Sequence, residues 1–232
     1  MSGSSAGWRP LTTLTPVRAR VEAPTTSSGE AEAVVAATFA AAGLITGGTV
    51  LVRNWPIGDP AAEYIADVFA QMQAYVVSSS AGLTVTSRST SGVLSPVELA
   101  VDQHPELVPL LVVLAAHASG RSRLIGADAQ VGDGVLGNLS ALGGSGVRVD
   151  GDLLIDPRPL TGGIWGAGGI ELALAGAVMA LAVPDIEIPD WGIVEQAYPG
   201  LTAQWLQMIA LDEYLVPGSA RLPHEYLSRP LR

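Results

Sequence analysis

The feature of this sequence that most constrains its fold is an alternation of helical and extended patterns, which returns three times at intervals of roughly 65 to 75 residues. In the first round an extended stretch precedes an Ala-rich helix over residues 30–42, which the pair Gly47-Gly48 ends before a strand over residues 49–53. A second helix follows Pro60, where apolar side chains recur at helical spacing, and residues 83–87 form the next strand.

The two later rounds follow a similar order. The second round contains a helix marked by leucines between Leu107 and Leu114, a strand over residues 123–125, a helix over residues 135–142, and strands over residues 147–149 and 153–155 joined at Asp150-Gly151. The third contains a helix over residues 169–181, a strand over residues 186–188 and a helix bearing Trp205, Met208 and Ile209. Any α/β protein alternates in this way, but the recurrence favours three copies of one unit.

The length and composition favour one folded domain. The chain has 232 residues, of which 48% are hydrophobic, and single cores usually stop growing at roughly 250 residues. We expect the domain at residues 29–215. Residues 1–28 are rich in Ser, Thr and Gly and are expected to form a flexible leader, and residues 216–232 are expected to form a tail with three arginines among prolines.

Composition also excludes several classes of function. The sequence has no cysteine, which excludes disulfides, thiolate catalysis and cysteine-bound metals. The formal net charge of −10 repels polyanions and the cationic residues are scattered, so we expect no nucleic-acid partner. A signal-peptide pattern and a run of about 18 apolar residues are both missing, so we expect a cytoplasmic protein without a membrane span.

No motif points to a metal or a cofactor. His104, His117 and His224 lie far apart and lack ligand spacing. There is no phosphate-binding P-loop, no dinucleotide fingerprint and no G-x-S-x-G elbow, and the glycine-rich residues 162–169 suit a loop before a helix. We therefore expect no cofactor and no metal site.

Several phrases of the sequence resemble the C-terminal domain of EPSP synthase, the 3-phosphoshikimate 1-carboxyvinyltransferase, in its actinobacterial form. In the family's order they are AATFAAAGLITGGTVLVRNWP at 36–56, HPELVPLLVVLAAHASG at 104–120, SRLIG at 122–126, ALGG at 141–144, residues 162–183, and Tyr198-Pro199-Gly200. The resemblance implies a single inside-out α/β domain of about three βαβαββ units with buried helices. In the family two such domains close over the substrates, so the chain is expected to supply one half of the cleft.

The resemblance also implies where a site would lie. In the family this domain supplies a proton-exchanging carboxylate and the cations that hold phosphoenolpyruvate, an anion that guanidinium groups pair with well. Glu106 matches the carboxylate position, although a solvated glutamate in a first helical turn is an equally simple reading. Glu171 stands where the family has an arginine, and Gln196 and Tyr198 stand in its lysine-containing run. Asp133 falls in a segment that lacks another family arginine, where it also suits a helix start.

These replacements predict a changed activity. A carboxylate about 4 Å from a phosphate costs several kcal/mol at an effective dielectric near 20, so we expect no enolpyruvyl transfer. Our first hypothesis is a repurposed domain of specialised metabolism that cyclises or isomerises a less charged organic substrate. Glu106 and Glu171 would be the catalytic acid or base, and Trp165, Gln196, Tyr198 and Asp133 would bind the substrate, with Trp165 shaping an apolar pocket.

Two alternatives remain open at this point. The tryptophans, Trp165 among them, also suit a role in covering the ends of the core. The chain could further be a catalytically silent interaction partner, or a half-enzyme of an enolpyruvyltransferase-like complex. In either case a second copy or another protein would cover the face of the missing domain.

Overall fold

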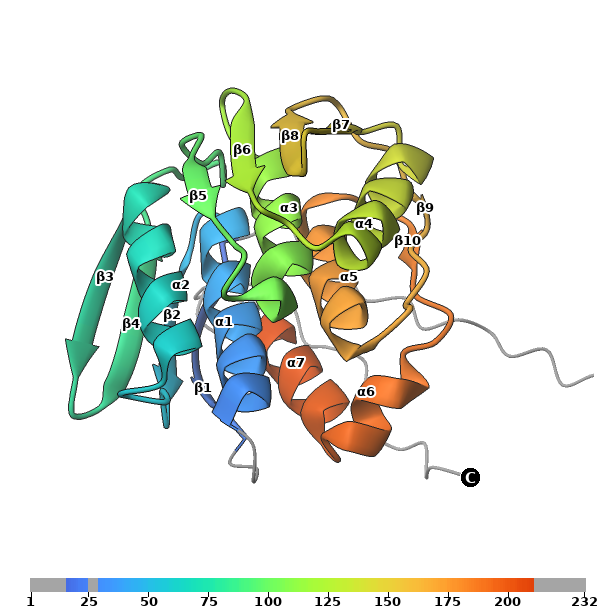
Figure 1. Cartoon of the computed structure of the whole chain (residues 1–232). Helices are drawn as coiled ribbons and strands as arrows, with labels where there is room; N and C mark the ends of the chain where they lie inside the picture. The colour runs from blue at the N-terminus through green and yellow to red at the C-terminus, as the bar shows by residue number, and fades with distance from the viewer. Residues whose placement is uncertain (1–15, 25–28, 211–232) are drawn as a thin grey trace, which may run out of the picture.

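The computed structural model describes residues 16–24 and 29–210 (Figure 1). In chain order the elements are β1 Arg18–Glu22, α1 Gly29–Ile45, β2 Thr49–Arg53, α2 Pro60–Gln71, β3 Ala74–Ser79, β4 Gly82–Ser87, β5 Glu98–Ala100, the 3-10 helix η1 Pro105–Leu107, α3 Val108–Ala116, β6 Ser122–Ile125, α4 Ala129–Ala141, β7 Ser145–Val149, β8 Asp152–Asp156, β9 Gly163–Ile164, α5 Ile170–Ala182, β10 Ile186–Glu187, α6 Gly192–Ala197 and α7 Leu201–Ala210. The predicted C-terminal tail lies outside the described residues. The predicted leader contains β1, so the folded unit begins before residue 29.

In the described residues the strands form three sheets, of which the two four-stranded ones share one plan. The first has the order β1-β2-β4-β3 and the second the matching order β5-β6-β8-β7. In both, the first two strands are parallel and the last two form an antiparallel hairpin. In the described part of the third unit, β9 and β10 form a parallel pair, and α6 and α7 follow where the other units have their hairpins. The structure therefore has two complete βαβαββ units and a third with a different end.

The helices α1, α3 and α5 form the centre of the molecule. Every residue of α3 is buried, as are nearly all described side chains of α1 from Ala33 onward and of α5 from Ala173 to Leu181. A helix that is apolar on all sides must be enclosed, and here the three helices pack side by side with the sheets outside them (Figure 1). The α/β class and the inside-out arrangement predicted from the sequence are confirmed.

The glycine pair at the end of α1 fixes how the first sheet closes. Gly47 has a φ of +74°, which favours glycine, and its N–H donates to the carbonyl oxygen of Leu44. A Cβ on Gly48 would collide with the backbone oxygen of Val17. The chain can therefore leave α1 directly into β2 beside β1, and Thr49 N donates to Val17 O at 2.7 Å.

None of the helices in the described residues is long and apolar enough to cross a membrane.

Candidate active site at the strand-exit end

The buried helices α1, α3 and α5 all begin at one end of the molecule, the lower end in Figure 1. The parallel strands that precede them finish at this end, so we call it the strand-exit end; it comprises the loops after β1, β2, β5, β6, β9 and β10 and the first turns of the helices that follow. Ligands of α/β sheets commonly bind outside the carboxyl ends of parallel strands. The predicted Glu106 and Glu171 both belong to this end, in the turns that open α3 and α5, and these two helices pack against each other.

Glu106 is part of a partly buried group of three side chains. It lies in η1, where its Oε1 is 3.3 Å from Nδ1 of His104, and the two side chains are 19% and 16% exposed. The His104 ring packs on Tyr64 of α2 with 4.8 Å between ring centroids, and the Tyr64 hydroxyl donates to the carbonyl oxygen of Ala100 at 2.9 Å. Burial, and next the negative charge of Asp102, raise the pKa of Tyr64 to about 12. Glu106 is thus held by a neighbour rather than freely solvated.

Glu171 and Tyr198 form a second group at the same end. A Cβ on Gly169 would stand 3.2 Å from Oε2 of Glu171, so the carboxylate turns back over the residue that precedes α5. A carboxylate in the first turn of a helix is favoured by the positive end of the helix dipole. Burial raises the pKa of Tyr198, and the carboxylates of Glu171 and Glu32 raise it further. The charge of Glu171 therefore acts on Tyr198, whose side chain is buried, whereas Gln196 lies exposed on α6.

Trp165 is a core residue and not the wall of a pocket. Its side chain is 0% exposed, and its Nε1 donates to the carbonyl oxygen of Leu172 at 2.7 Å. The ring fits against α5 beside Gly176, where a Cβ would meet Trp165 Cδ1 at 2.5 Å. This placement corrects the expectation that Trp165 shapes an apolar substrate pocket and agrees with the alternative that it covers the core. Trp55 and Trp191 are also buried.

Asp133 forms an ion pair with Arg148 while most of its side chain stays exposed. It lies exposed on α4, and its Oδ1 accepts a hydrogen bond from Nε of Arg148 at 2.9 Å. The other four N–H groups of Arg148 donate to the carbonyl oxygens of Ala127, Gly151, Asp128 and Ala129. A guanidinium has five N–H donors, and here all five have protein acceptors. Asp133 therefore orients the Arg148 guanidinium, which binds the carbonyl oxygens at the start of α4. Asp128 caps that helix by accepting a hydrogen bond from Val131 N.

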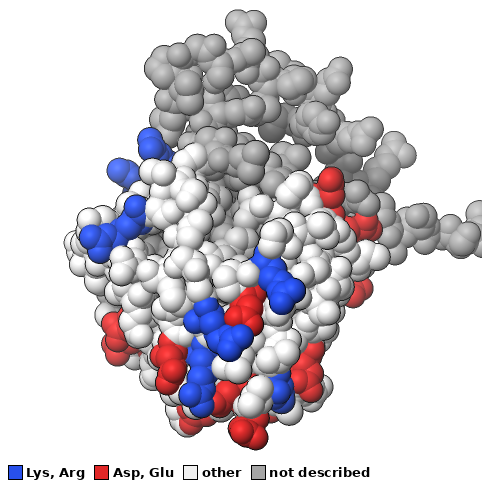
Figure 2. Space-filling view, turned by 90° about the horizontal axis from the view of Figure 1, so that it is seen from above, with Lys and Arg blue, Asp and Glu red and all other residues white. Residues whose placement is uncertain are grey.

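Two further arginines, Arg123 on β6 and Arg53 at the end of β2, each contact a carboxylate and remain about half exposed. Nε and Nη2 of Arg123 both donate to Oδ2 of Asp152, whose Oδ1 accepts from the backbone of Gly126. These hydrogen bonds lower the pKa of Asp152. Arg53 lies 3.9 Å from Glu22. Figure 2, which views the molecule from the opposite end, shows arginine and acidic side chains intermixed there, and the whole sequence contains no lysine.

Metal-ligand geometry gives no further candidate. Within residues 16–24 and 29–210, no group of three or more His, Asp or Glu side chains is placed to hold a metal ion.

The fold and the position of these groups define the class of the protein as enolpyruvyltransferase-like. The family model described as EPSP synthase (3-phosphoshikimate 1-carboxyvinyltransferase) matches residues 12–205, most of the chain, and the chain therefore belongs to the EPSP synthase family.

Solved structures with the same fold include the enolpyruvyl transferase NikO from Streptomyces tendae, with 21% sequence identity and a TM-score of 0.60 over 76% of this chain and 42% of that one. An EPSP synthase from Acinetobacter baumannii gives 20% identity and a TM-score of 0.59, over 75% of this chain and 43% of that enzyme. The chain thus spans less than half the length of the solved enzymes that it matches.

Sequence reasoning missed the neighbours of Glu106. The spacing His104-Pro105-Glu106 was a usable signal, because a proline at the start of a helix fixes the backbone between the two side chains. Tyr64 gave no local signal, since it reaches His104 from a helix some forty residues earlier through tertiary packing.

Proposed function

We propose that this chain is a repurposed EPSP-synthase-like domain that binds an organic substrate of low negative charge at the strand-exit end. It converts that substrate by positioning and proton transfer, as in a cyclisation or an isomerisation, rather than by transferring an enolpyruvyl group. Glu106 and Glu171 are the proton-transfer groups, and Tyr198 and Gln196 contact the substrate from the α6 side.

The observation that carries this proposal is that the Arg148 guanidinium is fully hydrogen-bonded within the protein. All five of its donors are hydrogen-bonded within the protein, so binding a phosphate would require breaking these bonds. At the start of α5, where the family has an arginine, Glu171 places a carboxylate over the helix N-terminus. The positive end of the helix dipole is therefore already matched by an anion of the chain itself.

Glu106 is suited to proton transfer because its neighbours restrain it. His104 holds the carboxylate from one side, and the Tyr64 ring restrains His104 in turn. A donor that orients a base reduces the reorganisation needed when a substrate proton is transferred. Tyr64 acts as a positioning residue, since its hydroxyl is engaged with Ala100 O.

The direct test is an assay of the purified chain with phosphoenolpyruvate and shikimate-3-phosphate, following phosphate release. We expect no release above the background of the reagents, and turnover of this pair would overturn the proposal. The Acinetobacter baumannii enzyme, assayed in parallel, is the positive control for the reagents. Once a substrate is found by metabolite screening, Glu106→Gln and Glu171→Gln should each lower kcat by about 100-fold or more, whereas Asp67→Asn on the exposed face of α2 should not.

The second candidate is a companion domain that is completed by a second copy or by another protein. It is favoured because the chain matches only 42% and 43% of the length of the two solved enzymes. In that arrangement the strand-exit end is covered by the partner, which must supply cations of its own. Light scattering on the chain as purified from its native host separates the two candidates. A stable complex whose partner confers enolpyruvyl transfer supports the companion, and a monomer that converts a substrate alone supports the repurposed enzyme.

A further inference from the structure

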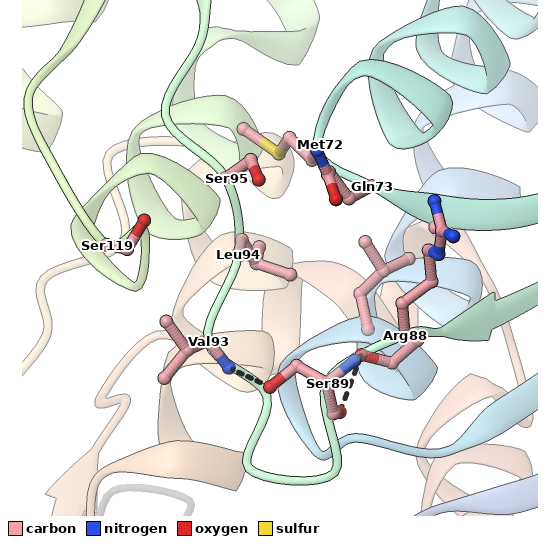
Figure 3. Close-up of a pocket in the computed structure, with 11 residues that line it drawn as sticks. Met72, Gln73, Arg88, Ser89, Val93, Leu94, Ser95 and Ser119 are labelled. Atoms are coloured by element: carbon pink, nitrogen blue, oxygen red, sulfur yellow. Dashed lines mark hydrogen bonds between the residues drawn. The ribbon is translucent and has the colours of Figure 1, made fainter.

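A second candidate site lies at the far end of the molecule from Glu106 and Glu171. A pocket of about 250 Å³ opens there between the ends of α1 and α2 and the connection that leads from β4 to β5. The residues that line it are Leu44, Met72, Gln73, Ala74, Ser87, Arg88, Ser89, Val93, Leu94, Ser95 and Ser119 (Figure 3). It lies on the seam between the first two units, because Leu94 N donates to His117 O and Ser119 N donates to Leu94 O.

The polar side chains of this pocket have unused hydrogen-bonding capacity. Within the described part of the chain, the guanidinium of Arg88 makes no hydrogen bond or ion pair, and its contact is with the face of the Tyr75 ring, 4.6 Å from the centroid. The side chains of Ser95, Ser119 and Gln73 likewise form no hydrogen bonds with other described residues. Figure 3 shows Arg88 and Ser119 on opposite sides of the pocket with Leu94 between them. This contrasts with Arg148, whose donors are all engaged.

The wall of the pocket is fixed by local structure. Val93 N donates to Oγ of Ser89 at 3.2 Å, and the hydroxyl of Ser87 donates to the carbonyl oxygen of Ser89 at 2.9 Å. A Cβ on Gly92 would collide with the carbonyl oxygen of Ile45, so this turn is seated directly on the end of α1. A pocket held in this way needs little reordering to accept a ligand, which favours binding.

We propose that this pocket binds a small organic acid. The Arg88 guanidinium pairs with the carboxylate, the apolar side chains Leu44, Met72 and Leu94 contact a short carbon chain, and the hydroxyls of Ser95 and Ser119 bind a polar substituent. The volume lies just below the range of roughly 300 to 1,000 Å³ found for drug-sized ligands, so the ligand has only a few carbon atoms. Such a ligand bridges the first two units and stabilises their seam. This site is independent of the strand-exit end.

The test is a titration of the full chain with butyrate, followed by ligand-observed NMR, with 1-butanol as the uncharged counterpart. We expect butyrate to bind with a Kd of a few millimolar, about tenfold or more tighter than butanol, because the charge-assisted pair requires the carboxylate. Arg88→Gln should weaken butyrate binding by about tenfold and leave butanol unaffected. Arg18→Gln, which changes the same charge on β1, is the matched control and should bind as the wild type does.

Ser119→Leu provides a second variant, which fills the pocket from the side opposite Arg88 and should weaken both ligands. Equal butyrate affinity in the wild type and in Arg88→Gln would overturn the proposal. Absence of saturable butyrate binding to the folded wild type at about 50 mM would overturn it as well. Arg88 and Ser119 are both exposed, so neither substitution should unfold the protein. Thermal melting of each variant checks that the contact between the first two units is intact.

Discussion

At the scale of single residues, the packing of Trp165 requires a glycine at position 176. The indole occupies the space that a side chain at position 176 would fill, and its N–H is satisfied by Leu172 O. A glycine in the interior of a helix costs up to about 1 kcal/mol relative to alanine, so its presence in α5 needs a packing reason. The close approach of Trp165 supplies that reason.

A pair of glycine variants tests this packing. Gly176→Ala should destabilise the protein by about 1 to 3 kcal/mol in spite of the better helix propensity, because the new methyl group displaces the Trp165 ring. Gly134→Ala in α4 meets nothing within 4 Å and should stabilise the protein by up to about 1 kcal/mol. Chemical denaturation measures both changes, and equal effects of the two substitutions would contradict the described packing.

His117 should make the stability depend on pH. It follows α3, its Nδ1 lies 2.9 Å from Val113 O, and burial lowers its pKa below the ordinary 6.5. The unfolded chain then binds more protons than the folded one, so stability falls as the pH drops from about 6.5 toward the lowered pKa. Above that window this contribution is fully present.

The measurement is the free energy of unfolding as a function of pH for the wild type and for His117→Gln. The variant should lose stability less steeply below about pH 6.5. Parallel curves for the two proteins would show that His117 does not titrate in this way.

At the scale of elements, α2 and α4 each begin with an aspartate cap. Oδ1 of Asp59 accepts from Ala62 N, and Oδ1 of Asp128 accepts from Val131 N, both at 3.0 Å. Asp59→Ala and Asp128→Ala should each cost about 1 kcal/mol of unfolding free energy. Asp67→Ala, within α2 and facing solvent, should change it by less than about 0.5 kcal/mol in a denaturant titration. A cost at Asp67 equal to that at Asp59 would contradict the capping role.

The sequence predicted those elements whose pattern was long and periodic. The helices α1, α3 and α5 and the hairpin of β7 and β8 stand where they were expected, because apolar runs and turn residues mark them locally. The strands β3 and β5 were missed, and so was β9, whose residues Gly163–Ile164 fall in the segment expected to be a loop. β3 is the outer strand of its sheet, with Tyr75 and Val77 exposed, and β5 has three residues and is defined by its pairing with β6. Partners distant in sequence decide such short strands.

The third unit differs from the unit that the sequence repeat predicted. The predicted helix with Trp205, Met208 and Ile209 is present as α7. The expectation of a third copy of the whole unit is wrong, because α6 and α7 stand where the other units have a hairpin, and α7 packs against β1. Gln204 of α7 donates to the carbonyl oxygen of Glu22 at 2.6 Å. This long-range contact joins the two ends of the described chain, and no local pattern encodes it.

At the scale of the whole molecule, the two candidate sites lie at opposite ends of the buried helices. The strand-exit end carries Glu106, Glu171 and the engaged Arg148, whereas the far end has Arg88 with its donors free among described residues. Glu106 and Glu171, the two carboxylates that the resemblance singled out, both lie in first helical turns. The resemblance could not show that Trp165 is enclosed or that Arg148 is saturated, because burial and hydrogen bonding depend on the folded neighbours.

Calorimetric titration of phosphoenolpyruvate into the purified wild-type chain tests the central claim most directly. We predict no saturable heat up to about 10 mM, because a negatively charged donor would face Glu171, while the guanidinium of Arg148 already donates all five of its hydrogen bonds within the protein. Glu171→Arg should bind more tightly than Asp67→Arg, which alters the net charge equally on the exposed face of α2. Saturable binding of phosphoenolpyruvate to the wild type with a Kd below about 1 mM would contradict the account.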